Sequence, residues 1–414
     1  MRTIHANSSA VREDHRALDV ATELAKTFRV TVRERERAGG TPKAERDAIR
    51  RSGLLTLLIS KERGGLGESW PTVYEAIAEI ASADASLGHL FGYHFSNFAY
   101  VDLFASPEQK ARWYPQAVRE RWFLGNASSE NNAHVLDWRV TATPLPDGSY
   151  EINGTKAFCS GSADADRLLV FAVTSRDPNG DGRIVAALIP SDRAGVQVNG
   201  DWDSLGMRQT DSGSVTFSGV VVYPDELLGT PGQVTDAFAS GSKPSLWTPI
   251  TQLIFTHLYL GIARGALEEA AHYSRSHSRP FTLAGVEKAT EDPYVLAIYG
   301  EFAAQLQVAE AGAREVALRV QELWERNHVT PEQRGQLMVQ VASAKIVATR
   351  LVIELTSRLY EAMGARAAAS RQFGFDRFWR DARTHTLHDP VAYKIREVGN
   401  WFLNHRFPTP SFYS

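Results

Sequence analysis

The sequence has little cysteine and no excess of charge of either sign. Cys159 is the one cysteine among 414 residues, which excludes an intramolecular disulfide and a metal site built from several cysteines. Lysine and arginine number 45 against 48 aspartates and glutamates, a net charge of −3. The chain therefore lacks the basic surplus that would neutralise a phosphate backbone, and we expect no nucleic-acid partner.

Long apolar runs are also missing. Runs such as residues 54–59 and 168–173 suit a buried core and are far shorter than the ~18–20 residues that span a bilayer. The polar stretch after Met1 does not resemble an apolar signal core. We therefore expect a cytoplasmic protein without a membrane partner. Its length, at roughly 100–200 residues per domain, predicts two to four domains.

The hydrophobic period changes twice along the chain. Residues 1–122 are predicted to form an N-terminal helical domain, with Val73, Ile77 and Ile80 at helical spacing. Residues 123–232 follow a period of two, which predicts a middle antiparallel β-barrel or sandwich. Its strands are expected over 139–143, 150–153, 167–174, 183–190 and 214–223. The Gly, Ser and Pro residues of 229–244 predict a linker.

The remaining residues, 233–414, are predicted to form a C-terminal four-helix bundle. One long helix should open at Asp292, because a proline follows it. A second should open at Thr330, where Thr-Pro-Glu-Gln is a capping box, and should end at Gly364. Helices of ~30 residues are ~45 Å long, a length that suits such a bundle.

Four motifs occur in the order found in acyl-CoA dehydrogenases. GNASSE (125–130) stands where that superfamily has a flavin-lining Thr-Glu-Pro segment, and NGTKAFCSG (153–161) resembles the strand that follows it. GMRQTDS (206–212) and RFWRDAR (377–383) resemble two further segments of the superfamily. The resemblance covers nearly the whole chain. It implies the acyl-CoA dehydrogenase-like fold, mainly α with a β-domain between the two helical domains.

Two departures from the dehydrogenases indicate a different reaction. The segment that usually supplies their carboxylate base reads THTLHDP (384–390) here, and the adenine-binding Q-x-x-G-G turn reads EAMGAR (361–366). The lost glutamine and second glycine disfavour FAD, whereas Arg366 suits the terminal phosphate of FMN. Both changes resemble the flavin monooxygenase branch of the superfamily.

Within that branch the chain resembles the dibenzothiophene monooxygenases of sulfur-removing bacteria. The segments that carry this resemblance are 88–94, 125–138, 206–213 and 373–394. The resemblance implies a homotetramer that receives reduced FMN from a separate NAD(P)H:FMN reductase. With O₂ as co-substrate, it would form a C4a-hydroperoxyflavin and oxygenate the sulfur of dibenzothiophene-type heterocycles to sulfoxide and sulfone. The sequence has no G-x-G-x-x-G fingerprint, so we expect no NAD(P)H site of its own.

The resemblance also assigns candidate residues. Ser160, Asn126 and His388 are the expected hydrogen-bond donors at the flavin edge, and His89 and Tyr93, one helical turn apart, should line the substrate side. Phe158, Trp202 and Tyr93 should supply an aromatic wall. Arg279 resembles an arginine that this superfamily lends to the flavin phosphate of a neighbouring subunit. The full set expected to bind FMN is Tyr93, Asn126, Ala127, Ser128, Ser129, Glu130, Asn131, Lys156, Phe158, Cys159, Ser160, Trp202, Arg279, Arg366, Ala367 and His388.

Other interpretations stay open. Glu269/His272 and Glu325/His328 are Glu-x-x-His pairs of the di-iron type, but the second lies at a charged helix end, so we expect no metal. An acyl-CoA dehydrogenase-like oxidoreductase with an altered base and a non-catalytic interaction protein are further alternatives. Cys159 could be inert filler.

Three structural expectations go with these interpretations. Arg380 and Arg383 around Asp381 should form an ion-pair network rather than act in catalysis. Loops 132–139 and 281–292 are expected to order when a ligand binds. The preferred heterocycle is left open among dibenzothiophene, benzothiophene, alkylated forms and indole.

Overall fold

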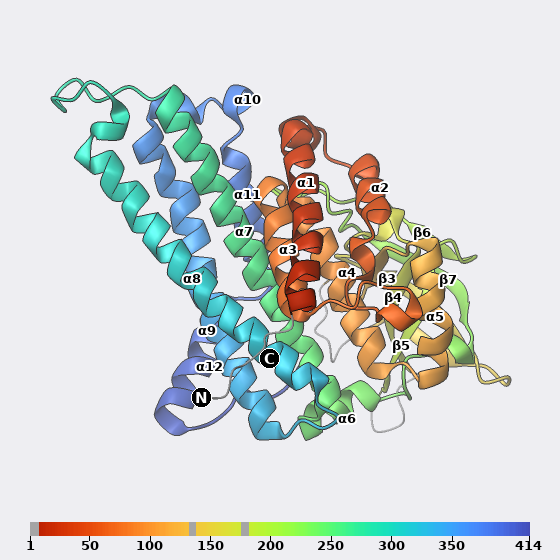
Figure 1. Ribbon diagram of the computed structural model, residues 1–414. Coiled ribbons are helices and arrows are strands. Elements are labelled where there is room, and N and C mark those ends of the chain that lie inside the picture. The colour runs from red at the N-terminus through yellow and green to blue at the C-terminus, as the bar shows by residue number, and fades with distance from the viewer. Residues whose placement is uncertain (1–7, 132–137, 175–181) are drawn as a thin grey trace.

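The computed structural model describes residues 8–131, 138–174 and 182–414. An N-terminal group of helices precedes the strands, and a C-terminal group follows them (Figure 1). The N-terminal helices are α1 (Ser8–Ala38), α2 (Lys43–Ser52), α3 (Trp70–Ala83), α4 (Ala85–Phe104) and α5 (Pro107–Glu120). The C-terminal helices are α6 (Gln233–Ser240), α7 (Trp247–Ser276), α8 (Pro293–Glu325), α9 (Pro331–Met363), α10 (Ser370–Phe373), α11 (Asp376–His385) and α12 (Val391–Asn404).

The strands belong to one seven-stranded sheet. They are β1 (Leu124–Ala127), β2 (Thr141–Pro144), β3 (Tyr150–Lys156), β4 (Arg167–Thr174), β5 (Ile184–Pro190), β6 (Val196–Val198) and β7 (Val215–Val222). Four pairings are antiparallel, but β1 and β2 both pair with β4 in parallel. Alternation along a strand does not give the direction of its neighbour, so the sequence did not reveal the parallel pairs.

The long helices follow the predicted signals closely. Thr330 caps α9 with the expected capping box, and Gly364 follows its last residue. Asp292 caps α8 and accepts a hydrogen bond from the backbone N–H of Tyr294. By length and composition α9 could cross a membrane, but 56% of its most apolar window is buried inside the protein, as in a core helix.

The segment 229–244, expected as a linker, contains helix α6 instead. Val234, Ala237 and Phe238 bury their side chains, and this i, i+3, i+4 spacing gives the short helix one apolar face. That face packs in an aromatic-rich core together with residues of α4, α5, β4 and β5. The glycines and prolines that suggested a linker lie around the helix, not within it.

Helices α3 and α4 lie between the sheet and the long C-terminal helices (Figure 1). They pack against α7, and α4 also contacts β1. The largest cluster of buried apolar residues joins them to α7, α8 and α9, while the sheet has its own core. Side chains from α4, α7, α11 and the sheet can therefore meet at one place. The class expected from the sequence, helices around a β-domain, is confirmed; the domain limits 1–122, 123–232 and 233–414 stay predictions.

Candidate functional site

His89 and Tyr93 lie where α4 passes the sheet. Asp84 caps α4, and its carboxylate accepts the backbone N–H of Leu87. His89 and Tyr93 then point to the same side, with ring centroids 4.6 Å apart. His89 Nε2 lies 2.9 Å from Ser160 Oγ, and Tyr93 Oη lies 3.1 Å from His388 Nε2. The structure thus brings together four of the five predicted catalytic side chains.

Ser160 is held by a strained turn at the end of β3. Phe158 and Gly161 both have positive φ, 53° and 74°, a conformation that costs energy for a phenylalanine. Arg46, fully buried, binds the carbonyl oxygen of Gly161 with two nitrogens at 3.2 Å each and that of Asp164 at 2.7 Å. The backbone N–H of Asn126, the fifth predicted residue, donates to the carbonyl of Ser160. The strain falls on Phe158, two residues before Ser160, and strained backbone of this kind is typical of functional sites.

A buried hydrogen-bond chain runs through Ser160 in both directions. On one side, His89 Nδ1 lies 2.9 Å from His385 Nε2, and His385 Nδ1 lies 2.9 Å from Tyr259 Oη. On the other, Ser160 Oγ lies 2.8 Å from Ser212 Oγ, which lies 2.7 Å from Thr210 Oγ1. The four additional residues, His385, Tyr259, Ser212 and Thr210, were not among the predicted site residues.

Some of these residues left a signal in the sequence and one left none. His385 precedes His388 by three residues, and Ser212 and Thr210 lie within the GMRQTDS motif. Tyr259 lies inside α7, whose neighbouring residues are buried and apolar, and no pattern marks it. Its importance depends on a contact across 126 residues of chain.

Burial keeps the two histidines of this hydrogen-bond chain, His89 and His385, neutral. Burial, with a smaller contribution from the nearby His388, lowers the pKa of His89 to about 3. Burial likewise holds the pKa of His385 well below its ordinary value, with His89 and His388 adding to the effect. Both rings therefore act as neutral donors and acceptors at ordinary pH.

A second polar cluster surrounds His388. Its Nδ1 lies 3.5 Å from Asp389 Oδ1, and that carboxylate also binds Lys345, which in turn binds Gln252. Burial works against the charge on Asp389, but the hydrogen bond from His388 and the charge of Lys345 outweigh it and hold the pKa of the carboxyl below its usual range. Asp389 is therefore an ion-pair partner and a poor base. His388 itself is 35% exposed.

The loop 206–212 fastens the sheet to α11. The backbone N–H of Met207 donates to Asp381 Oδ1 at 2.6 Å, and that of Gly206 donates to Thr384 Oγ1 at 2.8 Å. A Cβ on Gly206 would lie 2.3 Å from the backbone of Arg380, so only glycine fits there. Burial raises the pKa of Asp381 to about 7.

The prediction of an ion-pair network of Arg380 and Arg383 around Asp381 is wrong: among the described residues, no ion pair joins either arginine to Asp381. Arg380 pairs with Glu36 and Asp376, whereas Asp381 accepts the backbone bond from Met207. These residues hold the helix α11 and the loop together.

Other predicted cofactor residues divide into exposed and buried ones. Phe158 is 55% exposed, and its ring meets that of Trp202 edge-on at 6.2 Å. Ala127 and Cys159 point into the core of the sheet, and burial raises the pKa of the Cys159 thiol to about 12, so that side chain is inert. Of these four, only Phe158 and Trp202 present side chains at the surface.

Glu130 and Lys156 are occupied with each other. Lys156 Nζ lies 2.7 Å from Glu130 Oε1, and Glu130 also accepts the backbone N–H groups of Arg139 and Val140 at 2.6 and 3.1 Å. Ser128 accepts a hydrogen bond from the Asn126 side chain at 3.0 Å. The carbonyl of Ser129 accepts the N–H of Ala157, and Asn131 is exposed.

Arg279 and Arg366 lie elsewhere in the fold. Arg279 follows the end of α7, where Ser278 Oγ binds the carbonyl of Met363 at 3.0 Å, three residues before Arg366. Tyr259 lies 17 residues before the end of α7, so the two arginines are about 25 Å from the His385 cluster along the helix axis. Both are exposed, Ala367 beside them is buried, and no carboxylate of the described residues pairs with either arginine. Within one chain these residues do not join the Ser160 cluster.

The loop predictions fall in two parts. Residues 132–137 of the first loop lie outside the described residues. In the second loop Phe281 and Leu283 are 70% and 83% exposed.

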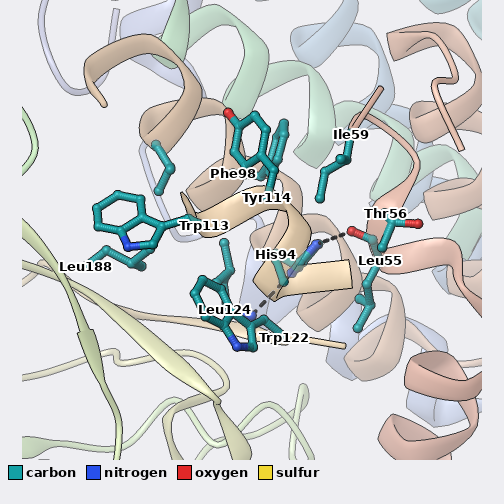
Figure 2. Close-up of a pocket in the computed structure, with 12 residues that line it drawn as sticks. Leu55, Thr56, Ile59, His94, Phe98, Trp113, Tyr114, Trp122, Leu124 and Leu188 are labelled. Carbon is teal, nitrogen blue, oxygen red and sulfur yellow. Dashed lines mark hydrogen bonds between the residues drawn. The ribbon is translucent and has the colours of Figure 1, made fainter. Parts of the chain in front are cut away.

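A separate small pocket lies among residues of α4, α5, β1 and β5 (Figure 2). It measures about 20 Å³, and its lining includes Leu55, Phe98, Trp113 and Trp122. That volume holds about one water molecule and no aromatic ligand. His94, at its edge, accepts the N–H of Leu124 and donates to the carbonyl of Leu55, so its role is structural.

The di-iron interpretation finds no support in the geometry. Glu269 is bound by Arg377, and His328 lies beyond the end of α8. Over residues 8–131, 138–174 and 182–414, no group of three His, Cys, Asp or Glu side chains is arranged to hold a metal ion.

Comparison with known proteins identifies the family. Models of the acyl-CoA dehydrogenase N-terminal, middle and C-terminal domains match residues 12–121, 127–220 and 253–392. The dibenzothiophene monooxygenase of Mycolicibacterium goodii is 52% identical, over 96% of this chain and 96% of that protein.

Two solved structures are similar along nearly the whole chain. The crystal structure of dibenzothiophene monooxygenase TdsC from Paenibacillus sp. A11-2 is 97% identical, with a TM-score of 0.93, and covers 97% of this chain and 100% of that chain. A complex of TdsC with FMN and indole is 98% identical, with a TM-score of 0.94 and the same coverage. The chain belongs to the acyl-CoA dehydrogenase family and, within it, to the branch that contains the dibenzothiophene monooxygenases.

Proposed function

We propose that this protein uses reduced FMN and O₂ to oxygenate the sulfur of a flat aromatic heterocycle of the dibenzothiophene type. The observation that carries the proposal is that hydroxyl and imidazole groups stand where a dehydrogenase has its carboxylate base. Where a dehydrogenase needs a carboxylate, His388 stands next to Tyr93, and Ser160 is bound to neutral His89. The nearby carboxylate, Asp389, is tied to Lys345 and has a low pKa, so it is unsuited to removing a proton from carbon.

The exposed residues around Ser160 fit FMN. Phe158 and Trp202 offer ring faces for a flat aromatic system, and the strain at Phe158 is explained if its ring serves a ligand. The side chains of Asn126, Ser128 and Ser129 would face the polar edge of the flavin. When bound, reduced FMN supplies the electrons that activate O₂.

The chain's own residues would orient protons in this site. Ser160 and Tyr93 carry hydroxyl donors on either side of His89, and His388, whose side chain is 35% exposed, adds a ring nitrogen beside Tyr93. Transfer of an oxygen atom leaves negative charge on the oxygen that stays behind, and donors aimed there stabilise the transition state more than the ground state. His89 and Tyr93 would also contact the substrate. Phe255, packed against both His385 and His388 at 4.8 Å, helps to exclude water.

A separate reductase and a homotetramer complete the proposal. The relatives include a probable FMNH2-dependent monooxygenase of Pseudomonas putida, 43% identical over 96% of this chain, and an external source of reduced FMN follows from that requirement. Exposed apolar side chains on α8, such as Tyr294 at 81% and Val308 at 73%, support burial against another copy. Arg279 and Arg366, remote from Ser160 within one chain, would then reach the FMN phosphate of a neighbouring subunit. The single buried cysteine suits a reducing cytoplasm.

The test is product analysis with reduced FMN, O₂ and a panel of dibenzothiophene, benzothiophene and indole. We expect sulfoxide and sulfone from the sulfur heterocycles. The alternative, an acyl-CoA dehydrogenase-like reaction with an altered base, predicts dye reduction that depends on acyl-CoA. If the panel yields only hydrogen peroxide and acyl-CoA reduces the dye, the proposal is wrong. Light scattering that finds a monomer at micromolar concentration would reject the tetramer.

A further inference from the structure

The chain of hydrogen bonds through Ser160 has a fixed end. Thr210 Oγ1 lies 2.9 Å from the carbonyl oxygen of Met207, and a carbonyl oxygen can only accept. That carbonyl also accepts the ring N–H of Trp202 at 2.8 Å and the backbone N–H of Thr210 at 3.3 Å. The 2.9 Å contact assigns the single hydroxyl proton of Thr210 to Met207 as well. Thr210 has no second proton, so it accepts from Ser212 at 2.7 Å.

The same count of protons fixes the next members. Ser212 has one hydroxyl proton, and Thr210 offers two acceptors for it, Oγ1 at 2.7 Å and the carbonyl oxygen at 3.4 Å. With either acceptor, Ser212 accepts from Ser160 at 2.8 Å. Ser160 has then used its own proton and accepts from His89 Nε2 at 2.9 Å. His89 must therefore carry its ring proton on Nε2.

The same reasoning assigns the ring protons of His89 and His385. His89 is neutral, so its Nδ1 is bare and accepts from His385 Nε2 at 2.9 Å. His385 is also neutral, so its Nδ1 is bare and accepts the hydroxyl proton of Tyr259 at 2.9 Å. Every proton from Tyr259 to Met207 then points the same way, and each donor in the chain has an acceptor.

Tyr259 has a second possible acceptor, the backbone carbonyl of His385 at 3.2 Å. That carbonyl already accepts the backbone N–H of His388 at 3.0 Å. Donation there would place the ring protons of His385 and His89 on Nδ1. Ser160 would then donate to His89, Ser212 to Ser160 and Thr210 to Ser212. Two observations favour the first arrangement: the contact of Tyr259 with His385 Nδ1 is the shorter one, and the reverse order would leave the 2.9 Å contact between Thr210 Oγ1 and the carbonyl of Met207 without a proton.

We infer that Tyr259 and His385 are positioning residues that lock His89 in its Nε2–H tautomer and thereby direct the hydroxyl proton of Ser160 away from His89. Without ligand, that proton goes to Ser212. With a ligand in the proposed site, it is available to an oxygen that faces Ser160. This inference rests on the proposed function only in naming that recipient. The tautomer lock is a property of the protein alone.

The lock is tested by nuclear magnetic resonance on protein labelled with ¹⁵N-histidine, without flavin. The His89 signals are assigned by their loss in His89→Asn. We expect the wild type to show a protonated Nε2 and a bare Nδ1 at His89, and Tyr259→Phe to show a mixture of the two tautomers. Tyr74→Phe is the matched control, because Tyr74 is also fully buried, donates to the carbonyl of Ile250 at 3.2 Å and stacks on His257 at 5.0 Å.

A wild-type His89 protonated on Nδ1 would overturn the inference, and so would an unchanged His89 tautomer in Tyr259→Phe. A second measurement follows the ratio of oxygenated product to O₂ consumed. We expect Tyr259→Phe to lower this ratio about tenfold, an effect of the size found when partners that orient a functional histidine are removed, with little change in KM. Tyr74→Phe should keep the wild-type ratio. If the wild type shows the expected tautomer but oxygenates no heterocycle, the proposed function fails while the lock stands.

Discussion

His385 and His388 lie three residues apart in the sequence, but their rings have different surroundings. Their rings are nearly parallel, with centroids 5.9 Å apart. His385 is buried between neutral partners, His89 and Tyr259, whereas His388 is 35% exposed beside the charged pair of Asp389 and Lys345. One imidazole is therefore held between neutral groups in the interior, whereas the other lies partly at the surface beside a charged pair. The comparison shows that burial and neighbours, not residue type, decide what a histidine does.

Loss of the ion pair beside His388, between Lys345 and Asp389, should have the largest effect, a loss of folding stability. Lys345→Met leaves Asp389 buried without its ion-pair partner, and the loss of one partner of a buried pair costs about 3–5 kcal/mol. We expect a correspondingly lower midpoint in urea and thermal unfolding. Lys43→Met, which removes the exposed partner of Asp47, is the control and should cost less than about 1 kcal/mol. Equal losses in the two variants would contradict the assignment of Lys345 and Asp389 as a buried pair.

A change among the neutral residues around His89 should lower activity and leave the fold intact. Ser160→Ala removes one donor from the proposed site, and such a loss costs about 10²–10³ in rate. We expect hydrogen peroxide in place of sulfoxide, measured as product per O₂ consumed. Ser162→Ala removes a buried hydroxyl two residues away that only contacts the carbonyl of Asp211 at 3.4 Å. Near wild-type coupling in Ser160→Ala would show that the serine is structural.

Arg279 sharpens the comparison by testing whether a third region belongs to the same site. If it binds FMN phosphate across a subunit interface, Arg279→Ala should weaken FMN about 10–100-fold, the loss of one charge-assisted hydrogen bond of about 1.5–3 kcal/mol. Calorimetric titration measures this effect. Arg275→Ala, an exposed arginine in the last turn of α7, is the control. Unchanged affinity in Arg279→Ala would reject the contribution from a second subunit.

The smallest expected effect is a change in how steeply the free energy of unfolding depends on pH. The folded protein holds the pKa of His89 at about 3 and that of His385 well below 6.5, so unfolding lets both rings bind protons as the pH falls below about 6.5. Stability is therefore full above pH 6.5 and declines as the pH falls toward 3, by about 1.4 kcal/mol per pH unit for each ring. His385→Gln should remove one ring's share of the slope in unfolding measured between pH 6 and pH 4. A slope identical to that of the wild type would mean that His385 is not held neutral.

Short sequence signals predicted the features that depend on neighbouring residues, above all the ends of the long helices. Proline after Asp292, the capping box at Thr330 and the glycine at 364 set the ends of α8 and α9, because helix termini depend on a few neighbouring residues. Other local segments, among them 88–94, 153–161 and 373–394, carried the family resemblance and with it Ser160, His89, Tyr93 and His388, which the structure brings into contact.

The missed features all depend on distant contacts. Tyr259 becomes part of the site only because α7 passes the end of α11, and the parallel pairing of β1 with β4 joins segments about 40 residues apart. The sequence did not predict helix α6, because its few apolar residues are stabilised only by packing against an aromatic core that other elements form. The remote position of Arg279 likewise appears only when the length of α7 is known.

The close approach of Gly206 to α11 has a consequence for the order of folding. Met207 and Asp381 are 174 residues apart in the chain, and their contact closes only when the loop and the helix dock with no side chain between them. Helical contacts between near neighbours form early, whereas long loops are closed late because their closure costs entropy first. Thr210, Ser212 and His385 are carried by this same loop and helix. The geometry at Ser160 should therefore be acquired last during refolding, after most of the helical structure has already returned.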